Sequence, residues 1–291
     1  MGVPRLHRLA LERSEQAVAS GALCPLTTRV EPWHGSDAES FELRSLIGAP
    51  PRHLRPAGPK PNPFRPWDQR LELEPVGGDH VLILNKYPVQ IGHMLLITRD
   101  WAPQTGWLSP LDWQAVHSVR QHSSGLWFFN SGPRAGASQP HRHLQLLPRE
   151  PGQPLCPRAT WWESKLLGEP EGRRRDRLDE RTSVVALSSA TAETLHEAYL
   201  TLCQAQGMGH PSVDALPRNP YNLLFCDRWM GLVSRSHDEC NGFSINALGF
   251  AGYLLCTDHS DRPWLDQHGP GGLLNQVVST ADFRDTTDAL D

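Results

Sequence analysis

Three polar side chains, His141, His143 and Gln145, alternate with apolar ones near the middle of this 291-residue chain. Residues two apart in a β-strand point to the same face, so the two imidazoles and the carboxamide would share one side. Just upstream, the small residues of segment 136–138 would let backbone amides approach a ligand closely, as phosphate-binding turns do. Imidazole is largely unprotonated near neutral pH, because its ordinary pKa is about 6.5. The pattern predicts a phosphate site that contains a nucleophile, and it does not decide which histidine acts.

A His-x-His pair on a strand is also compatible with two roles that involve no nucleophile. The two histidines could be half-buried side chains that are satisfied by their neighbours, or His141 and His143 could bind a zinc ion. The absence of a convincing third ligand nearby in the sequence counts against zinc. A nucleophilic role is chemically reasonable because an imidazole phosphoramidate is labile enough to pass its group onward.

Several elements must position this pattern. Apolar runs bounded by Gly, Asn and Pro predict an antiparallel pair of strands at 81–84 and 92–99. A Ser-Pro-x-Asp sequence is typical of a helix N-terminus and predicts a helix over 109–121. A third strand is expected at 127–130, and the His-x-His segment would be the fourth. Leu144 and Leu146 would then enter a core on the side opposite the polar residues.

The segments that flank this unit look less regular. Residues 5–20 predict an amphipathic helix that ends at a glycine. Residues 25–70 are rich in Pro, Arg and polar side chains, and predict a long surface segment with one strand near 41–43. Residues 150–182 are interpreted as irregular and charged, and the arginine run at 173–177 as a solvated loop rather than a phosphate site.

The last third of the chain repeats the first half faintly. A helix is expected at 191–206, and the strands expected at 221–226 and 230–235 read like residues 82–99 with a shorter turn. No His-x-His strand closes this half. The sequence therefore predicts an internally duplicated α+β architecture, an antiparallel sheet with flanking helices, whose second half lacks the nucleophile strand.

Composition limits the kinds of function. A hydrophobic content of 38% supports a real core, and a net charge of −4 argues against a nucleic-acid partner. The six cysteines include no Cys-x-x-Cys pair, and no signal peptide is apparent, so we expect reduced thiols in a cytoplasmic protein. No apolar run approaches the roughly 20 residues needed to span a membrane.

The order Gly-Ala-Ser-x-x-His-x-His-x-Gln closely resembles a signature of the histidine triad superfamily, in the branch where Gln replaces the third His. Within that branch the chain resembles the diadenosine tetraphosphate phosphorylase (ATP adenylyltransferase) family, whose Asn-Pro-Phe it also carries at 62–64. The resemblance covers roughly residues 62–257 and is strongest at 136–148. It implies a histidine-triad-like fold.

With this resemblance we divide the chain into four segments. Residues 1–70 hold the N-terminal helix and the Pro-rich segment, and residues 71–150 form the catalytic half. Residues 151–190 form an irregular charged connection, and residues 191–291 form a degenerate second half with the C-terminal tail.

The resemblance also assigns roles to residues. It implies that His143, the middle histidine, is the nucleophile, and that the backbone carbonyl of His141 orients it. Gln145 would donate to a phosphate oxygen, which is typically worth about 10²–10³ in rate. A carboxamide cannot act as a general acid, so the leaving group must already be a good one. Substrate contacts carried over from the family are Asn85, Lys86, Asn130, Gly136, Ala137, Ser138, Gln139, Asn246 and Leu248, although core packing would account for Leu248 equally well.

Two family lysines have no clear match. One would fall near Thr257, which is uncharged, and Arg52 or Lys60 would have to replace the other. Both positions serve the distal phosphates or the second base, so the resemblance leaves the preferred dinucleotide and acceptor open.

These expectations lead to one predicted function. The chain would be a nucleotidyltransferase that cleaves diadenosine tetraphosphate with inorganic phosphate to ATP and ADP, through an adenylyl-histidine. The alternatives are a related dinucleotide hydrolase, an adenylylsulfate-using adenylyltransferase, and a nucleotide-binding sensor without turnover. No covalent cofactor is implied. Mg²⁺ could accompany the polyphosphate, but we see no dedicated carboxylate cluster for it. The sequence predicts no oligomeric state.

Overall fold

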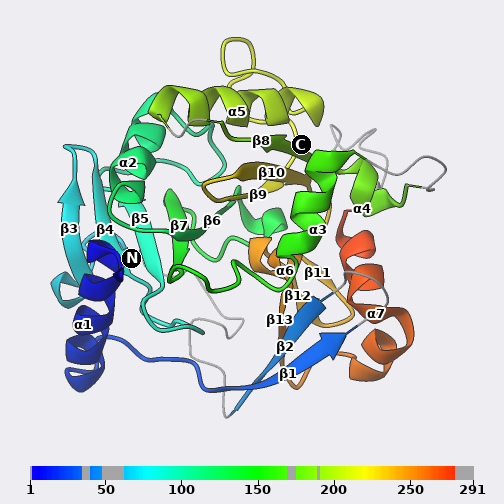
Figure 1. Cartoon of the computed structure of the whole chain (residues 1–291), viewed down its shortest axis with the longest axis horizontal. Helices are drawn as coiled ribbons and strands as arrows, with labels where there is room; N and C mark the ends of the chain where they lie inside the picture. The colour runs from blue at the N-terminus through cyan, green and yellow to red at the C-terminus, as the bar shows by residue number, and fades with distance from the viewer. Residues whose placement is uncertain (1, 35–39, 48–61, 169–174, 189–190, 279–291) are drawn as a thin grey trace, which may run out of the picture.

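The computed structural model describes residues 2–34, 40–47, 62–168, 175–188 and 191–278 (Figure 1). An eight-stranded antiparallel sheet in the order β3-β4-β5-β7-β6-β9-β10-β8 forms its centre. The first half of the chain supplies β3 (Glu72–Val76), β4 (His80–Leu84), β5 (Met94–Thr98), β6 (Gly125–Asn130) and β7 (His143–Pro148). The second half supplies β8 (Thr182–Ala186), β9 (Tyr221–Phe225) and β10 (Trp229–Ser234). The expected strand positions are confirmed in both halves.

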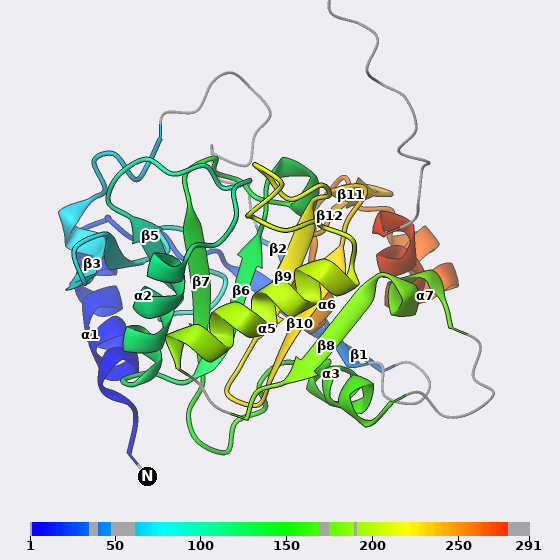
Figure 2. The same ribbon diagram turned by 90° about the horizontal axis from the view of Figure 1, so that it is seen from above.

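One face of the main sheet is covered by α1 (Arg5–Ala19), α2 (Pro110–Arg120) and α5 (Ala192–Ala205) (Figure 2). Trp113 of α2 and Tyr199 of α5 are fully buried there, and Leu144 and Leu146 of β7 enter the same cluster as expected. Helix α2 begins with the predicted cap: the Ser109 amide donates to the Asp112 carboxylate at 2.7 Å, and the Ser109 hydroxyl accepts from the Asp112 amide.

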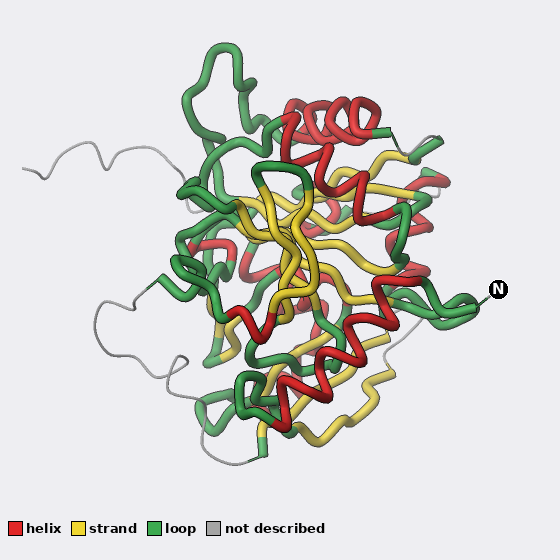
Figure 3. Tube along the Cα trace, turned by 90° about the vertical axis from the view of Figure 1, so that its left-hand side faces the viewer, coloured by secondary structure: helices red, strands yellow, loops and turns green. Residues whose placement is uncertain are grey.

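The opposite face is covered differently in the two halves. Over the second half lie α3 (Ala159–Ser164), α6 (Ala247–Ala251), α7 (Arg262–Val277) and a small sheet of β1 (Thr28–His34), β2 (Ser40–Leu46) and β13 (Tyr253–Cys256). Over β4 and β5, among the described residues, lie the side chains of Phe64 and Trp67, in a smaller apolar cluster. Figure 3 shows the strands at the centre with the helices around them.

Three expectations about the flanking segments are corrected. The single strand near 41–43 is part of a hairpin, β1 and β2, and β3 was missed because its sequence is polar and its register shifts between Glu72 and Glu74. The connection expected to be irregular contains α3, α4 (Arg177–Glu180) and β8. The sequence did not reveal these elements, because each is too short to show a recognisable period. The shorter elements are η2 (Gln69–Leu71), η3 (Pro133–Ala135), η4 (Lys165–Leu167), α4 (Arg177–Glu180), β11 (Glu239–Cys240) and β12 (Phe243–Ser244). Within the described ranges, no helix combines the length and the apolar character needed to cross a bilayer.

The sheet order fits an internal duplication, but it changes which strands of the two halves correspond. On either side of the central β6–β9 pair, the strands run β6-β7-β5 in one direction and β9-β10-β8 in the other. The chain order β8, α5, β9, β10 therefore repeats β5, α2, β6, β7. Strands β9 and β10 correspond to β6 and β7, and not to β4 and β5 as the sequence suggested. The second half does have a strand in the place of β7, but this strand, β10, carries no histidine.

Candidate active site

The imidazole of His143 is held by its own chain. His143 is the first residue of β7 and is 4% exposed. Its Nδ1 lies 2.8 Å from the backbone carbonyl oxygen of His141, which can only accept, so Nδ1 carries the proton and Nε2 is left with a free lone pair. Burial lowers the pKa of His143 to about 4, although the bond to the His141 carbonyl raises it. The ring is therefore neutral and aligned near neutral pH.

His141 lies just before β7 and is fully buried. Its Nε2 donates to the Thr98 carbonyl at 2.9 Å, which leaves Nδ1 to accept from the Asn62 amide at 2.9 Å. Burial lowers the pKa of His141 despite the bond to Thr98. The ring of Phe64 packs 5.6 Å from His141 and 5.4 Å from His143, so residues 62–64 form part of the site. The His141 ring is fixed by these neighbours, and its carbonyl orients His143.

A third histidine, His93, completes this face and was missed in the sequence. The buried His93 accepts at Nδ1 from the side-chain amide of Asn85 at 3.1 Å, so its Nε2 carries the proton. This Nε2–H faces the Gln145 carboxamide, although no hydrogen bond of normal geometry forms there among the described residues. Burial lowers the pKa of His93 to about 3, partly offset by the neighbouring carboxamide of Gln145. A lone polar residue at the start of an apolar strand was the available signal.

Asn85 and Lys86 occupy the turn after β4. The Asn85 side chain is already used, because its oxygen accepts from the Tyr87 amide at 3.1 Å while its nitrogen holds His93. Lys86 is exposed, with its ammonium 5.7 Å from the Tyr87 ring. In this structure Asn85 positions His93, and Lys86 is the turn residue that could reach a phosphate.

The small-residue turn packs against the second half of the chain. Gly136 has a left-handed backbone with φ of 80°, and an added Cβ would lie 2.6 Å from the Ile245 carbonyl oxygen. The amides of Gly136 and Ala137 donate to the carbonyls of Pro133 and Gly132. Those two amides are therefore used within the turn, and Ser138, which is exposed, and Gln139, which is half-buried, remain as the turn's candidate phosphate donors.

Asn130 connects the two halves. Its side-chain oxygen accepts from the Asn222 amide group at 2.8 Å and from the Ala247 backbone amide at 2.9 Å. Asn246 caps α6 by accepting from the Leu248 amide at 2.9 Å. Leu248 is half-buried and packs against the core of the second half, which was the alternative account of this residue. Asn222, the opposite neighbour of Asn130 in the β6–β9 pair, was not identified in the sequence.

The positions proposed to replace the family lysines are only partly described. Arg52 and Lys60 lie outside the described residues. Thr257 lies in a turn, where its amide donates to the Ser260 hydroxyl at 3.0 Å and its own hydroxyl accepts from the His259 amide.

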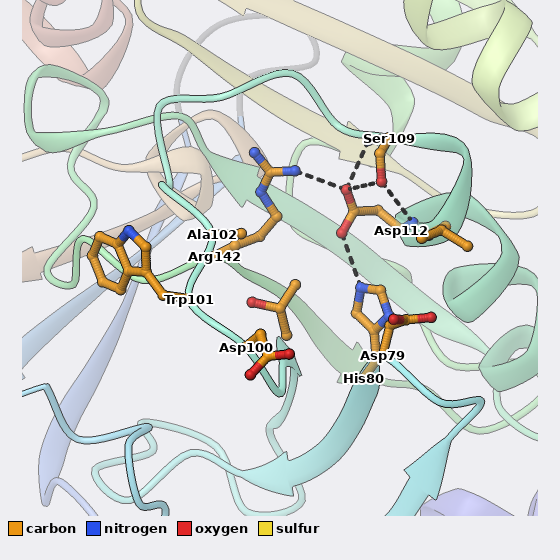
Figure 4. A pocket seen from close by; sticks show the side chains of 10 residues that line it. Asp79, His80, Asp100, Trp101, Ala102, Ser109, Asp112 and Arg142 are labelled. Carbon is orange, nitrogen blue, oxygen red and sulfur yellow. Dashed lines mark hydrogen bonds and ion pairs between the residues drawn. The ribbon is translucent and has the colours of Figure 1, made fainter.

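Arg142, which lies between the two histidines in the sequence, belongs to a buried polar cluster with Asp112 and His80 (Figure 4). Asp112 accepts from His80 Nε2 and from Arg142, both at 2.9 Å, beside a cavity of about 190 Å³. Burial alone would raise the pKa of Asp112, but the bond from His80 and the charge of Arg142 lower it. Arg142 also donates to the carbonyls of Pro103 and Trp107, so it fastens the 101–109 loop beside the site.

In the part of the chain that the structure describes, no three or more His, Cys, Asp or Glu side chains converge as metal ligands. The site consists of neutral imidazoles, carboxamides and backbone groups. This set can hold a phosphoryl group and attack it from His143.

Comparisons with known proteins agree with this geometry. Residues 3–158 match the model for the Ap4A phosphorylase N-terminal domain, and residues 177–280 match the model for the ATP adenylyltransferase C-terminal domain. The chain is 28% identical over 235 residues to diadenosine 5',5'''-P1,P4-tetraphosphate phosphorylase 2 of Saccharomyces cerevisiae, covering 68% of this chain and 69% of the relative. It is also 28% identical to Protein APA1 of the same yeast, over 84% of this chain and 83% of the relative.

Solved structures show the same fold. The crystal structure of yeast Ap4A phosphorylase Apa2 in complex with AMP superposes with a TM-score of 0.72 at 23% identity, covering 95% of this chain and 97% of Apa2. The structure of Apa2 in complex with Ap4A gives a TM-score of 0.71 at 22% identity, over 96% and 97% of the two chains. With more than half of its residues matched by the N-terminal family model, the chain belongs to the Ap4A phosphorylase family.

Proposed function

We propose that this nucleotidyltransferase cleaves diadenosine tetraphosphate with inorganic phosphate to ATP and ADP, through an adenylyl group carried on His143. The observation that carries the proposal is the His143 imidazole, whose Nδ1 donates to the His141 carbonyl and whose Nε2 lone pair is free. The lowered pKa supports a neutral nucleophile. Relatives that are named for Ap4A phosphorylase activity support the choice of substrate.

The reaction proceeds in two displacements. Nε2 of His143 attacks the α-phosphorus, a P–N bond forms, and the bond to the bridging oxygen breaks so that ATP leaves with the electron pair. An oxygen of inorganic phosphate then attacks the adenylyl phosphorus, the P–N bond breaks, and ADP leaves while the imidazole regains its lone pair. Covalent catalysis of this kind divides one difficult step into two easier ones.

Gln145 and His93 act on the phosphoryl oxygens. The side chain of Gln145 shares the face of His143 and faces the Nε2–H of His93. In the proposed complex His93 donates to the Gln145 carbonyl oxygen, which turns the Gln145 amide group toward the phosphate. A donor aimed at developing charge is worth about 10²–10³ in rate.

The remaining contacts are proposed as follows. Lys86, Ser138 and Gln139 offer donors to the polyphosphate, while Asn85 acts through His93. Asn130, Gly136, Ala137, Asn246 and Leu248 shape the wall between the two halves. Mg²⁺, where it takes part, enters bound to the polyphosphate. The six cysteines are free, which supports a reducing compartment such as the cytoplasm.

The test is to incubate the protein with diadenosine tetraphosphate, with and without phosphate, and to separate the nucleotides, with His143→Ala beside it. We expect ATP and ADP in equal amounts only with phosphate, and neither from the variant. Without phosphate, one ATP per active site should appear together with an adenylylated protein that is acid-labile, as phosphoramidates are.

Each alternative outcome has a defined meaning. AMP formed without phosphate would identify a hydrolase, and turnover that requires sulfate instead of phosphate would identify an adenylylsulfate-type transferase. Stoichiometric binding with no adenylyl-protein would identify a sensor. Any of these would overturn the proposed reaction.

A further inference from the structure

The ladder between β6 and β7 ends before it reaches the nucleophile. The two strands pair from Gly125 and Pro148 to Phe128 and Gln145. Continued in the same register, the ladder would place Asn130 opposite His143. That pair does not form.

The side chain of Gln104 fills this gap. Its Oε1 accepts from the His143 backbone amide at 2.9 Å, and its Nε2 donates to the Asn130 carbonyl at 2.7 Å and the His143 carbonyl at 3.2 Å. Gln104 is 1% exposed, so these bonds form away from water. A carboxamide has the donor and acceptor of a peptide group, and here it replaces the missing ladder partner of both strands.

The loop that carries Gln104 also replaces β6 as the neighbour of the segment before β7. The Arg142 amide donates to the Ala102 carbonyl, and the Gln104 amide donates to the Pro140 carbonyl, both at 2.8 Å. Pro103 and His141 form an isolated antiparallel bridge. The peptide groups on both sides of the catalytic histidines are therefore fixed by the 102–104 segment.

We propose that Gln104 is a positioning residue of the adenylyl transfer, which fixes the direction of the His143 imidazole relative to Asn130 and the second half. Its carboxamide accepts from the His143 amide and donates to the Asn130 carbonyl. The side chain of Asn130 in turn accepts hydrogen bonds from Asn222 and Ala247 in the second half of the chain. The chemical part of this inference rests on the proposed function. A misplacement of about 1 Å at a reacting group can lower a rate by roughly 10²-fold.

The first variant is Gln104→Leu, which keeps most of the volume and removes the donor and the acceptor. In a single turnover with diadenosine tetraphosphate and no phosphate, we expect the rate constant of adenylylation to fall roughly 10- to 100-fold. The apparent KM should change far less, because Gln104 is not placed to touch the substrate.

The second variant, Gln104→Glu, separates positioning from simple loss of packing. The protonated carboxyl keeps a donor for the Asn130 carbonyl and an acceptor for the His143 amide, whereas the carboxylate cannot donate and would face two carbonyl oxygens. The adenylylation rate should therefore be partly rescued where the introduced carboxyl is protonated, and should fall as that carboxyl ionises with rising pH. The NMR signals of the His143 imidazole should stay near the wild-type positions in the first range and shift in the second, which reports the ring geometry independently of turnover.

Val119→Ala serves as the control for lost stability, because Val119 of α2 is buried in the apolar cluster on the face of the sheet opposite His143. It should lower the thermal midpoint without lowering the adenylylation rate at 25 °C. If Gln104→Leu lowers the midpoint similarly and reacts within twofold of wild type, Gln104 is only structural and the inference is wrong.

A failure of the proposed function is distinguishable from a failure of this inference. If wild-type protein forms no adenylyl-protein from diadenosine tetraphosphate, the proposed function fails. The NMR signals of the His143 imidazole in Gln104→Leu and Gln104→Glu still decide the positioning role, since signals identical to wild type in both variants would overturn it.

Discussion

Strands β7 and β10 occupy matching places in the two halves of the sheet, yet their faces opposite α2 and α5 are occupied differently. β7 presents His143 and Gln145. On the corresponding face β10 carries Gly231, and the ring of Trp162 lies directly on it, so that an added Cβ would clash with the ring. Trp162 also stacks on Trp229, with ring centroids 5.1 Å apart and planes 10° apart.

The comparison teaches that the sheet alone does not make a site. Both strands are packed by the same kind of helix on one side, α2 in the first half and α5 in the second. On the other side, α3 fills the space over β10 with indole rings, whereas over β7 the histidines remain bonded to backbone and carboxamide groups. In the first half this face holds the candidate nucleophile, and in the second half it belongs to the apolar core.

The largest expected effect comes from the first half. His143→Gln removes the nucleophile while keeping a polar side chain, so we expect turnover of diadenosine tetraphosphate to fall roughly 10⁴- to 10⁶-fold, with little change in thermal midpoint. Nucleotide separation and a circular dichroism melt measure the two quantities. A variant that retains a tenth of the activity would show that another group carries the adenylyl.

The second half should respond in the opposite way. Trp162→Ala removes a fully buried indole, so we expect the free energy of unfolding to fall by about 3–5 kcal/mol in urea titrations. The kcat of the remaining folded protein should stay near the wild-type value. A tenfold loss of kcat in protein that is still fully folded would show that the two faces are not independent.

A smaller loss of stability is expected from a substitution at the contact between Gly231 and the Trp162 ring. Gly231→Ala places a methyl group against the Trp162 ring and should cost about 1–3 kcal/mol of stability. Gly78→Ala is the matched control, since an added Cβ there has no neighbour within 4 Å. In the Trp162→Ala background, Gly231→Ala should cost much less, and additive costs in the double mutant would contradict the direct contact.

The smallest expected effect is the change of kcat/KM as the pH is lowered from 7 to 5. The pKa of His143 is lowered to about 4, so kcat/KM should stay within roughly twofold between pH 7 and pH 5, where an imidazole of ordinary pKa would already be mostly protonated. Below about pH 4 protonation removes the nucleophile and the rate should fall. Between pH 6.5 and 4 the unfolded chain binds more protons here, so this group's contribution to stability should fall as the pH drops. A rate that halves near pH 6.5 would disprove the lowered pKa.

The local sequence predicted the elements whose signals are complete within a few residues. The capping box of α2, the buried runs of β4 and β5, and the alternation of β7 each depend on neighbours in sequence. The expected bond from the His143 ring to the His141 carbonyl is present, because it spans only two residues.

Residues that act across the fold could not be found in this way. Gln104 bonds the His143 amide, and His93 lies beside the Gln145 side chain. Both come from segments some 40–50 residues earlier in the sequence, and neither belongs to a recognisable motif. The true correspondence of β10 with β7 follows from pairing order, which the similarity of two apolar runs cannot reveal. Indoles from α3 cover β10 because of tertiary packing alone.

The β6–β9 pair joins the two halves within a single polypeptide. In a symmetric pair of identical subunits, every mutation occurs twice, so a residue that closes one pocket also closes the other. Inside one gene each side can change by itself. The joined strands therefore allow aromatic side chains to fill the face over β10 while the face over β7 keeps its histidines, a difference that the identical subunits of a symmetric dimer do not have.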